Sequence, residues 1–238
     1  MQLTPAVRQG IAIGVATGVY AISYGALAVA AGLSVWQAQA LSLLMFTGGS
    51  QFGFVGVVAG GGSVATAVST ASLLGVRNAV YGIQMNALLR PTGWRRPLAA
   101  HLTIDESVAT AGGQEDPAEQ HRGFWAAGLA VFVFWNAFTL VGALLGNAVG
   151  DTGRFGLDGA SVAAFLGLLW PRLRTGEGAA VACVCALVTL LVTPALPAGI
   201  PILVAALVAL AIGWARRGTD GGEPVDIPME DHRPEDHR

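Results

Sequence analysis

The chain contains no lysine and few charges of either sign. Only 12% of its 238 residues are charged, whereas 53% are hydrophobic and 33 are glycine. A soluble domain carries about twice that fraction of charged residues, and closely packed helices in a bilayer are rich in glycine. The composition therefore indicates a membrane protein. Because its arginines sit singly or in small groups beside apolar runs, the pattern also excludes a nucleic-acid-binding protein.

Cysteine is equally scarce, with only Cys183 and Cys185. Two positions apart on a helix, they point to different faces and can neither form a disulfide with each other nor chelate a metal together. We expect both to be plain core residues. There is no phosphate loop or dinucleotide fingerprint, and His101 and Asp105 form a helical pair without a third ligand. The chain is therefore expected not to be an enzyme and to use no metal or cofactor.

Apolar segments separated by short polar ones fill the chain up to residue 215. They cover residues 10–33, 35–60, 63–89, 124–150, 157–170, 178–191 and 200–215. Several approach or exceed the roughly 20 residues that an α-helix needs to cross a bilayer. The pattern predicts an all-α polytopic membrane protein with about seven transmembrane helices. It also predicts a transport domain at 1–215 and a disordered, acidic tail at 216–238.

A polar interruption, Phe46-Thr47-Gly48-Gly49-Ser50-Gln51, divides the segment 35–60. Two adjacent glycines are poor helix interior, so we expect a break in the helix near the middle of the bilayer. Free N–H groups at the N-terminus of a half-helix bind a carboxylate, while carbonyls or an acid hold an ammonium. A zwitterionic amino acid fits such a site. The alternative is that the glycine pair is a packing notch for a neighbouring helix.

Two topologies are open for residues 35–60. In the preferred one they cross the bilayer, the N-terminus is outside, and most arginines beside the apolar runs are cytoplasmic. Weak similarity around Gly25 and Gly142, offset by three spans, then predicts an inverted 3+3 repeat with broken helices near the midplane, plus one extra helix. In the other, residues 35–60 form a re-entrant hairpin, Arg8 is cytoplasmic and the repeats are parallel. Chance similarity between helices rich in glycine and alanine is the alternative to a repeat.

Polar residues at mid-length of these segments are candidates for a transport site. The candidates for substrate binding are Tyr24, Thr47, Gly48, Gly49, Ser50, Gln51, Arg77, Asn78 and Tyr81. Arg77 is either a carboxylate anchor or a structural arginine paired with Asp105 or Glu106, because an unpaired charge at that depth is costly. The two acids and His101 are candidates for proton coupling or gating. Their alternative is the solvated face of an interfacial helix at 98–110.

Several of these motifs resemble the AzlC family, the large subunits of bacterial branched-chain amino acid permeases or exporters. They are Tyr24-Gly25-Ala26-Leu27, the stretch from Phe46 to Gln51, Arg77 with Tyr81, Leu102-Thr103-Ile104-Asp105-Glu106-Ser107, Gly156-Leu157-Asp158 and Pro197-Ala198-Gly199. The chain departs from the family at Gly75-Val76-Arg77-Asn78, where Asn-x-Arg-His is common. The resemblance implies a permease for branched-chain or other hydrophobic amino acids that works with a small membrane partner, AzlD.

Three functions are compatible with these features. The preferred one is a secondary transporter that exports small neutral amino acids by alternating access in the bacterial cytoplasmic membrane, with its C-terminal tail in the cytoplasm. The second is a channel or carrier for another small polar solute or anion, with Arg77 as its selectivity charge. The third is a non-transporting scaffold or sensor whose acidic tail binds a soluble partner. The expected partners of the transporter are the bilayer, its amino acid and an AzlD-type subunit, and a homo-oligomer is compatible with it.

Overall fold

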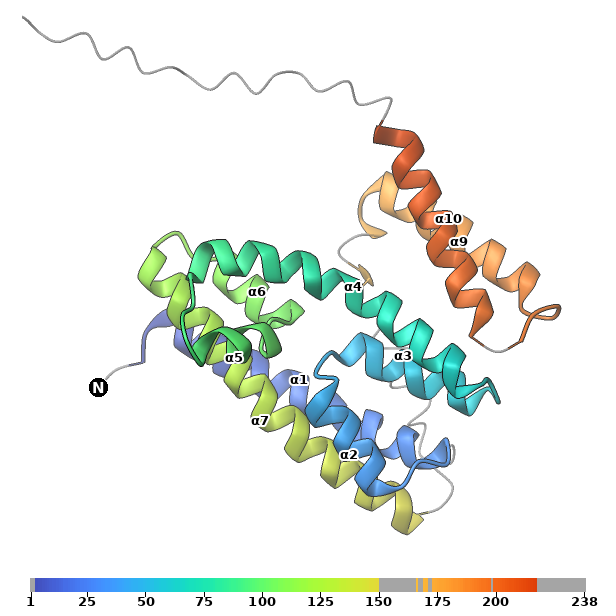
Figure 1. The fold of residues 1–238 in the computed structure, drawn as a ribbon, viewed down its shortest axis with the longest axis horizontal. Coiled ribbons are helices and arrows are strands. Elements are labelled where there is room, and N and C mark those ends of the chain that lie inside the picture. The colour runs from blue at the N-terminus through green and yellow to red at the C-terminus, as the bar shows by residue number, and fades with distance from the viewer. Residues whose placement is uncertain (1–2, 150–165, 167–168, 171–172, 198, 218–238) are drawn as a thin grey trace, which may run out of the picture.

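The computed structural model describes residues 3–149, 166, 169–170, 173–197 and 199–217. Every element in this part of the chain is an α-helix (Figure 1). Two helices, α1 (Pro5–Ala30) and α7 (Pro117–Val149), are long and apolar enough to cross a membrane. The all-α prediction is thus confirmed for the described residues. Most of the expected run 157–170, Asp158 and the tail from residue 218 lie outside them.

The other helices are α2 (Val35–Leu44), α3 (Gly48–Ala59), α4 (Val64–Leu89), α5 (Arg95–His101), α6 (Asp105–Gly112), α9 (Gly176–Val192) and α10 (Ile200–Arg217). Helix α10 ends at Arg217, two residues beyond the end expected for the transport domain. One correction concerns α9. Cys183 in α9 is exposed, so the expectation of two core cysteines is wrong for this residue. The reason is that α9 packs mainly on α10 and leaves its other faces uncovered.

Helices α1 and α7 lie side by side and approach each other through small residues (Figure 1). The glycines on the contacting face of α1 are Gly10, Gly14, Gly18 and Gly25. A Cβ atom on Gly14 would lie 2.6 Å from the Cβ of Ala130, and one on Gly142 would collide with the backbone of Ile22. Only glycine fits at such positions. Backbone approach of this kind is how helices associate in a bilayer, where apolar burial gives no driving force.

These two helices run parallel. Gly10 of α1 lies against Ala127 of α7, and Gly25 lies against Ala143, so the contacts advance in the same direction along both chains. An inverted repeat whose halves begin with the similar segments around Gly25 and Gly142 requires antiparallel helices. That prediction is therefore wrong for this pair. The physical reason is that α4 alone crosses the bundle between α1 and α7. The segment that joins α1 to α4 and the segment that joins α4 to α7 both turn back, so α1 and α7 run in the same direction.

The first of these segments, α2 with α3, forms a hairpin. Helix α2 turns back along α1, where the Tyr24 hydroxyl donates to the carbonyl of Ala38 over 3.5 Å. The backbone leaves the helix at Met45 and is extended at Thr47, and α3 then returns. Its last turn lies beside the start of α2, since Leu33 and Val58 line the same surface cavity. The crossing topology preferred for residues 35–60 is thus wrong, and the re-entrant alternative fits.

The second segment, α5 with α6, forms a hairpin that enters from the opposite end. Its outer end lies beside the start of α1, where Gln114 donates to Gln9 over 3.0 Å. Its tip lies against α7, where the His101 and Phe132 rings are 5.7 Å apart. Phe132 also contacts Phe46, at the tip of the first hairpin, with ring centroids 5.1 Å apart. Both tips therefore meet near the midpoint of α7.

Helix α4 runs between the two ends of the bundle, antiparallel to α1 (Figure 1). The chain thus forms a long helix followed by a hairpin (α1, then α2 with α3). It then forms the same arrangement in the reverse direction (α4, then α5 with α6) and continues into α7. Five arginines gather at the end where α1 and α7 begin and α4 ends, and we name it the arginine end: Arg8, Arg90, Arg95, Arg96 and Arg122. The turns at the other end, residues 31–34 and 60–63, carry no charge.

By the positive-inside rule we expect the arginine end, and with it the N-terminus, to be cytoplasmic. This orientation can be checked in cells by labelling single cysteines in a Cys183→Ala, Cys185→Ala background. Cysteines at Ala31 and Gly60 should both react with an impermeant thiol reagent from outside, and cysteines at Leu3 and Thr92 should react only after the membrane is opened. Labelling of Ala31→Cys and Gly60→Cys from opposite sides would contradict the hairpin.

Candidate functional site

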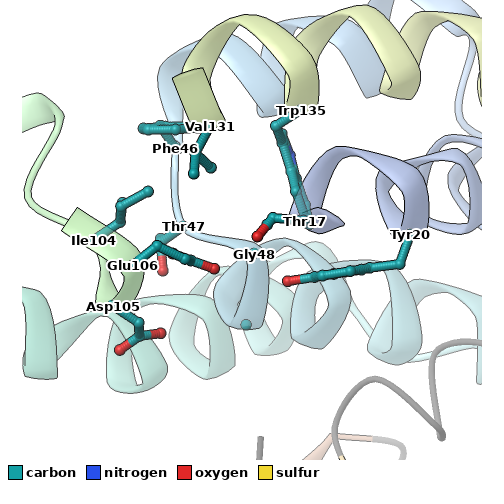
Figure 2. Close-up of a pocket in the computed structure, with 11 residues that line it drawn as sticks. Thr17, Tyr20, Phe46, Thr47, Gly48, Ile104, Asp105, Glu106, Val131 and Trp135 are labelled. Atoms are coloured by element: carbon teal, nitrogen blue, oxygen red, sulfur yellow. The ribbon is translucent and has the colours of Figure 1, made fainter. Parts of the chain in front are cut away.

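A small cavity lies where the two hairpin tips meet α1 and α7 (Figure 2). It is lined by Thr17 and Tyr20 of α1, Phe46 to Gly49 of the first hairpin, Ile104 to Glu106 of the second hairpin, and Val131 and Trp135 of α7. Its volume is about 20 Å³, which is room for about one water molecule. Because these positions lie near the midpoints of α1 and α7, the cavity is at mid-membrane depth when those helices span the bilayer.

The N-terminus of α3 forms one wall of this cavity. Thr47 precedes the helix without a side-chain cap, and the first bond inside the helix runs from the Gln51 N–H to the Thr47 carbonyl over 3.1 Å. The N–H groups of Gly48, Gly49 and Ser50 therefore have no acceptor within the helix. Together with the helix dipole they form a partial positive charge that favours an anion.

The glycine pair at this helix end also serves packing. A Cβ on Gly48 would lie 3.0 Å from the Trp135 ring, and one on Gly49 would lie 2.8 Å from the Nη2 atom of Arg77. Both neighbours would have to move to admit a side chain. The glycine pair therefore accommodates Trp135 and Arg77, as the packing-notch alternative expects. Because glycine has no side chain, the backbone N–H groups of Gly48 and Gly49 are not covered by side chains of their own residues.

The N-terminus of α6 forms the opposite wall and begins with two acids. Figure 2 shows the Glu106 carboxylate directed toward Gly48 and the Tyr20 hydroxyl, whereas Asp105 points away from them. Asp105 instead pairs with Arg77 of α4, with 2.8 Å between Oδ2 and Nη2. This confirms the ion pair expected for Arg77. The cavity therefore has N–H groups without an intrahelical acceptor on one wall and the Glu106 carboxylate on the other.

Arg77 connects the two hairpins. Its Nη2 atom bonds Asp105 at the start of α6 and lies beside Gly49 at the start of α3. The side chain is 38% exposed, and its Nε atom is buried without a hydrogen-bond partner among the described residues. A cation placed between the two helix ends offsets the charge of Asp105 and contacts the first hairpin at the same time.

Each hairpin tip is held by a polar side chain from the first turn of its outgoing helix. Gln51 is fully buried, donates to the Met45 carbonyl and accepts from Trp135 Nε1, each over 2.8 Å. Ser107 is its counterpart, since its hydroxyl donates to the Leu102 carbonyl over 2.7 Å. These bonds satisfy backbone groups that leave helical geometry at membrane depth. Gln51, expected to contact substrate, thus has a structural position.

The structure separates the sequence-derived candidates into three groups. Those that line the cavity are Thr47, Gly48, Gly49, Asp105 and Glu106. Ser50 lines a different cavity, between α2, α3 and α4. The candidates that line neither of these two cavities are Tyr24, Gln51, Arg77, Asn78, Tyr81 and His101. Tyr24 is fully buried against Phe52 and Trp135, and the His101 ring packs on Phe46 and Phe132.

Sequence reasoning missed several lining residues. Thr17, Tyr20, Val131 and Trp135 come from the long apolar helices, where nothing in the local pattern marks them. For Tyr20 a signal existed, because it lies one helical turn before Tyr24 and therefore on a neighbouring part of the same face. Trp135 has no such signal, since its position opposite Gly48 depends on the alignment of α1, α3 and α7.

Comparison with known proteins adds three findings. A family model described as AzlC protein matches residues 12–149, which include both hairpins and every residue that lines the cavity. A Helicobacter pylori (strain ATCC 700392 / 26695) protein named as an uncharacterized membrane protein is 25% identical over 128 residues. The match covers 53% of this chain and 56% of that relative, so the chain spans about half the length of the relative. No solved structure matches the chain.

The ion pair between the hairpins can be measured by a double-mutant cycle. Arg77→Gln and Asp105→Asn should each destabilise the purified protein in detergent, because each leaves one charge unpaired, and the double variant should recover part of the loss. We expect a coupling energy of about 1 kcal/mol or more by thermal unfolding. The more exposed pair Glu177 and Arg216 is the matched control and should give below about 0.5 kcal/mol. Strict additivity for Arg77 and Asp105 would contradict the bridge.

Proposed function

The chain belongs to the AzlC family, and on that premise we propose that it is a secondary transporter of small neutral amino acids that binds its substrate between the two hairpin tips. The family is associated with membrane transport of amino acids. The observation that carries the proposal is the opposite character of the two helix ends that face each other. One presents bare N–H groups, and the other presents carboxylates.

A zwitterion fits this arrangement in one orientation. Its carboxylate accepts hydrogen bonds from the N–H groups of Gly48 and Gly49, where the dipole of α3 favours negative charge. Its ammonium faces Glu106, which Figure 2 shows directed into the space between the tips. The hydroxyl of Tyr20 lies beside the carboxylate of Glu106 and can hold that side chain in position. Asp105 is occupied by Arg77, so one of the two acids remains for the ammonium.

The size of the cavity supports a carrier rather than an open channel. At about 20 Å³ it cannot admit an amino acid, so the hairpin tips must separate before the substrate can bind. The two hairpins enter from opposite ends of the bundle, and displacement of either would open the cavity toward its own end. Alternating access then follows, with the first hairpin as the outer gate and the second as the gate at the arginine end. Broken helices around a midplane site are typical of secondary transporters.

The direction, coupling and partner are part of the proposal. We propose export across the bacterial cytoplasmic membrane, driven by the proton gradient, by exchange or by the substrate gradient, together with a small AzlD-type membrane subunit. Branched-chain amino acids are the first substrates to test. Glu106 is the residue through which protons would act, because a carboxylate that holds an ammonium in one state is free to take a proton in the other.

The proposal is tested by flux of labelled amino acids in proteoliposomes that contain the chain and its small partner. Leucine, valine, methionine and alanine should be tested with wild type, Gly49→Ala and Gly56→Ala. We expect Gly49→Ala to lower kcat/KM about tenfold or more, because its methyl group displaces Arg77 from the helix end. Gly56 is the matched control on α3, since a Cβ there meets nothing within 4 Å.

Absence of protein-dependent flux for every amino acid would refute transport of this class. Equal activity of Gly49→Ala and wild type would be compatible with transport but would contradict a substrate site at the N-terminus of α3. A current that does not saturate with solute concentration would instead identify a channel.

A further inference from the structure

A second cavity lies directly behind the tip of the first hairpin, between α2, α3 and α4. It opens to the surface of the protein, where Val68 and Ser72 are exposed; its volume is about 380 Å³, and most of the surface that lines it is apolar. The lining residues used below are Met45, Thr47, Ser50, Ala71, Ser72 and Gly75. A space of this size falls in the range of small-molecule sites, whereas the cavity between the tips holds about one water molecule.

The two cavities share Thr47. This residue is the last extended position before α3, so the helix end that receives the carboxylate in the proposed function lies between them. A molecule whose charged groups bind between the tips and whose apolar part passes Thr47 would occupy both spaces. An α-amino acid has this shape, because its two charges and its side chain leave one carbon atom in different directions.

Ser50 gives independent support that this cavity holds a polar or exchangeable occupant. Its side chain is fully buried, and its hydroxyl has no hydrogen-bond partner among the described residues. A buried hydroxyl without a partner is uncommon, and such a group in a roomy cavity is solvated by water. Water in a mostly apolar cavity is readily displaced by an apolar group. A neutral side chain of the substrate that enters past Thr47 would displace this water, and the displacement would favour binding.

The cavity owes part of its room to Gly75. A Cβ at this position would lie 3.4 Å from the Ser50 hydroxyl oxygen, so any larger side chain would extend into the space beside Ser50. Gly75 is also one of the two positions, with Asn78, where the chain departs from the motif Asn-x-Arg-His. An asparagine there would fill the cavity and supply the missing partner for Ser50.

We propose that this cavity is the specificity pocket of the transporter, which receives the side chain of a large neutral amino acid, and that Gly75 sets the length it admits. The inference rests on the proposed function and adds to it the place where substrates are distinguished. Leucine and methionine place their side chains in the pocket, whereas alanine binds through its charged groups alone. Gly75 and Ala71 are specificity-determining, and neither lines the cavity that holds the charges.

The test compares leucine and alanine flux in proteoliposomes for wild type, Gly75→Asn and Gly82→Asn. Gly82 is the matched control, because it lies on the same helix and a Cβ there meets nothing within 4 Å. Gly75→Asn should raise the KM for leucine about tenfold or more and leave the KM for alanine within about twofold. Gly82→Asn should change neither.

Ala71→Leu fills the same cavity from one turn earlier on α4 and should have the same selective effect, which keeps the test valid should Gly75→Asn fail to fold. A loss of equal size for leucine and alanine, or no change for either, would overturn the specificity pocket while transport itself stands. Equal losses would indicate that the cavity holds a lipid chain that supports the fold. Absence of flux for both amino acids in wild type would overturn the proposed function and this inference with it.

Discussion

A backbone that leaves helical geometry at membrane depth must find its hydrogen-bond partners within the protein, because the hydrocarbon offers none. Both hairpins meet this constraint with a polar side chain in the first turn of the returning helix. In the first, buried Gln51 bonds the Met45 carbonyl and is held by Trp135. In the second, Ser107 bonds the Leu102 carbonyl. The first N–H groups of α3 and α6 have no acceptor within their own helices, and these helix ends line the cavity where the proposed substrate binds.

The scaffold for these tips is the pair α1 and α7, which run parallel and approach closely because glycine occupies their contact face. Parallel alignment is a consequence of the hairpins, since only α4 crosses between them. One long helix with a hairpin, followed by a second in the reverse direction, places the tips opposite each other at mid-depth (Figure 1). The two tips differ chemically: Gly48 and Gly49 begin α3, whereas Asp105 and Glu106 begin α6. This difference gives the cavity its polarity.

The sequence predicted the helical class, the break at the glycine pair and the pairing of Arg77, because each depends on local composition or on the cost of an isolated charge at depth. It failed on whether residues 35–60 cross the bilayer. An apolar run has the same length whether it forms one crossing helix or a hairpin of two half-helices. The structure distinguishes the two, because Leu33 and Val58, from the two ends of the run, line the same cavity. Trp135 was missed because its place in the site depends on helix alignment across more than 80 residues of chain.

The central claim is that the two hairpin tips meet at mid-membrane around the transported molecule. It is tested most directly by a pair of cysteines at Phe46 and His101, whose rings are 5.7 Å apart, in a background without Cys183 and Cys185. A short thiol crosslinker should join the two tips and stop amino acid flux, and reversal of the crosslink should restore it. The pair Phe46→Cys with Trp94→Cys, at the arginine end, should not be joined. Failure of positions 46 and 101 to crosslink in folded, transporting protein would contradict the account.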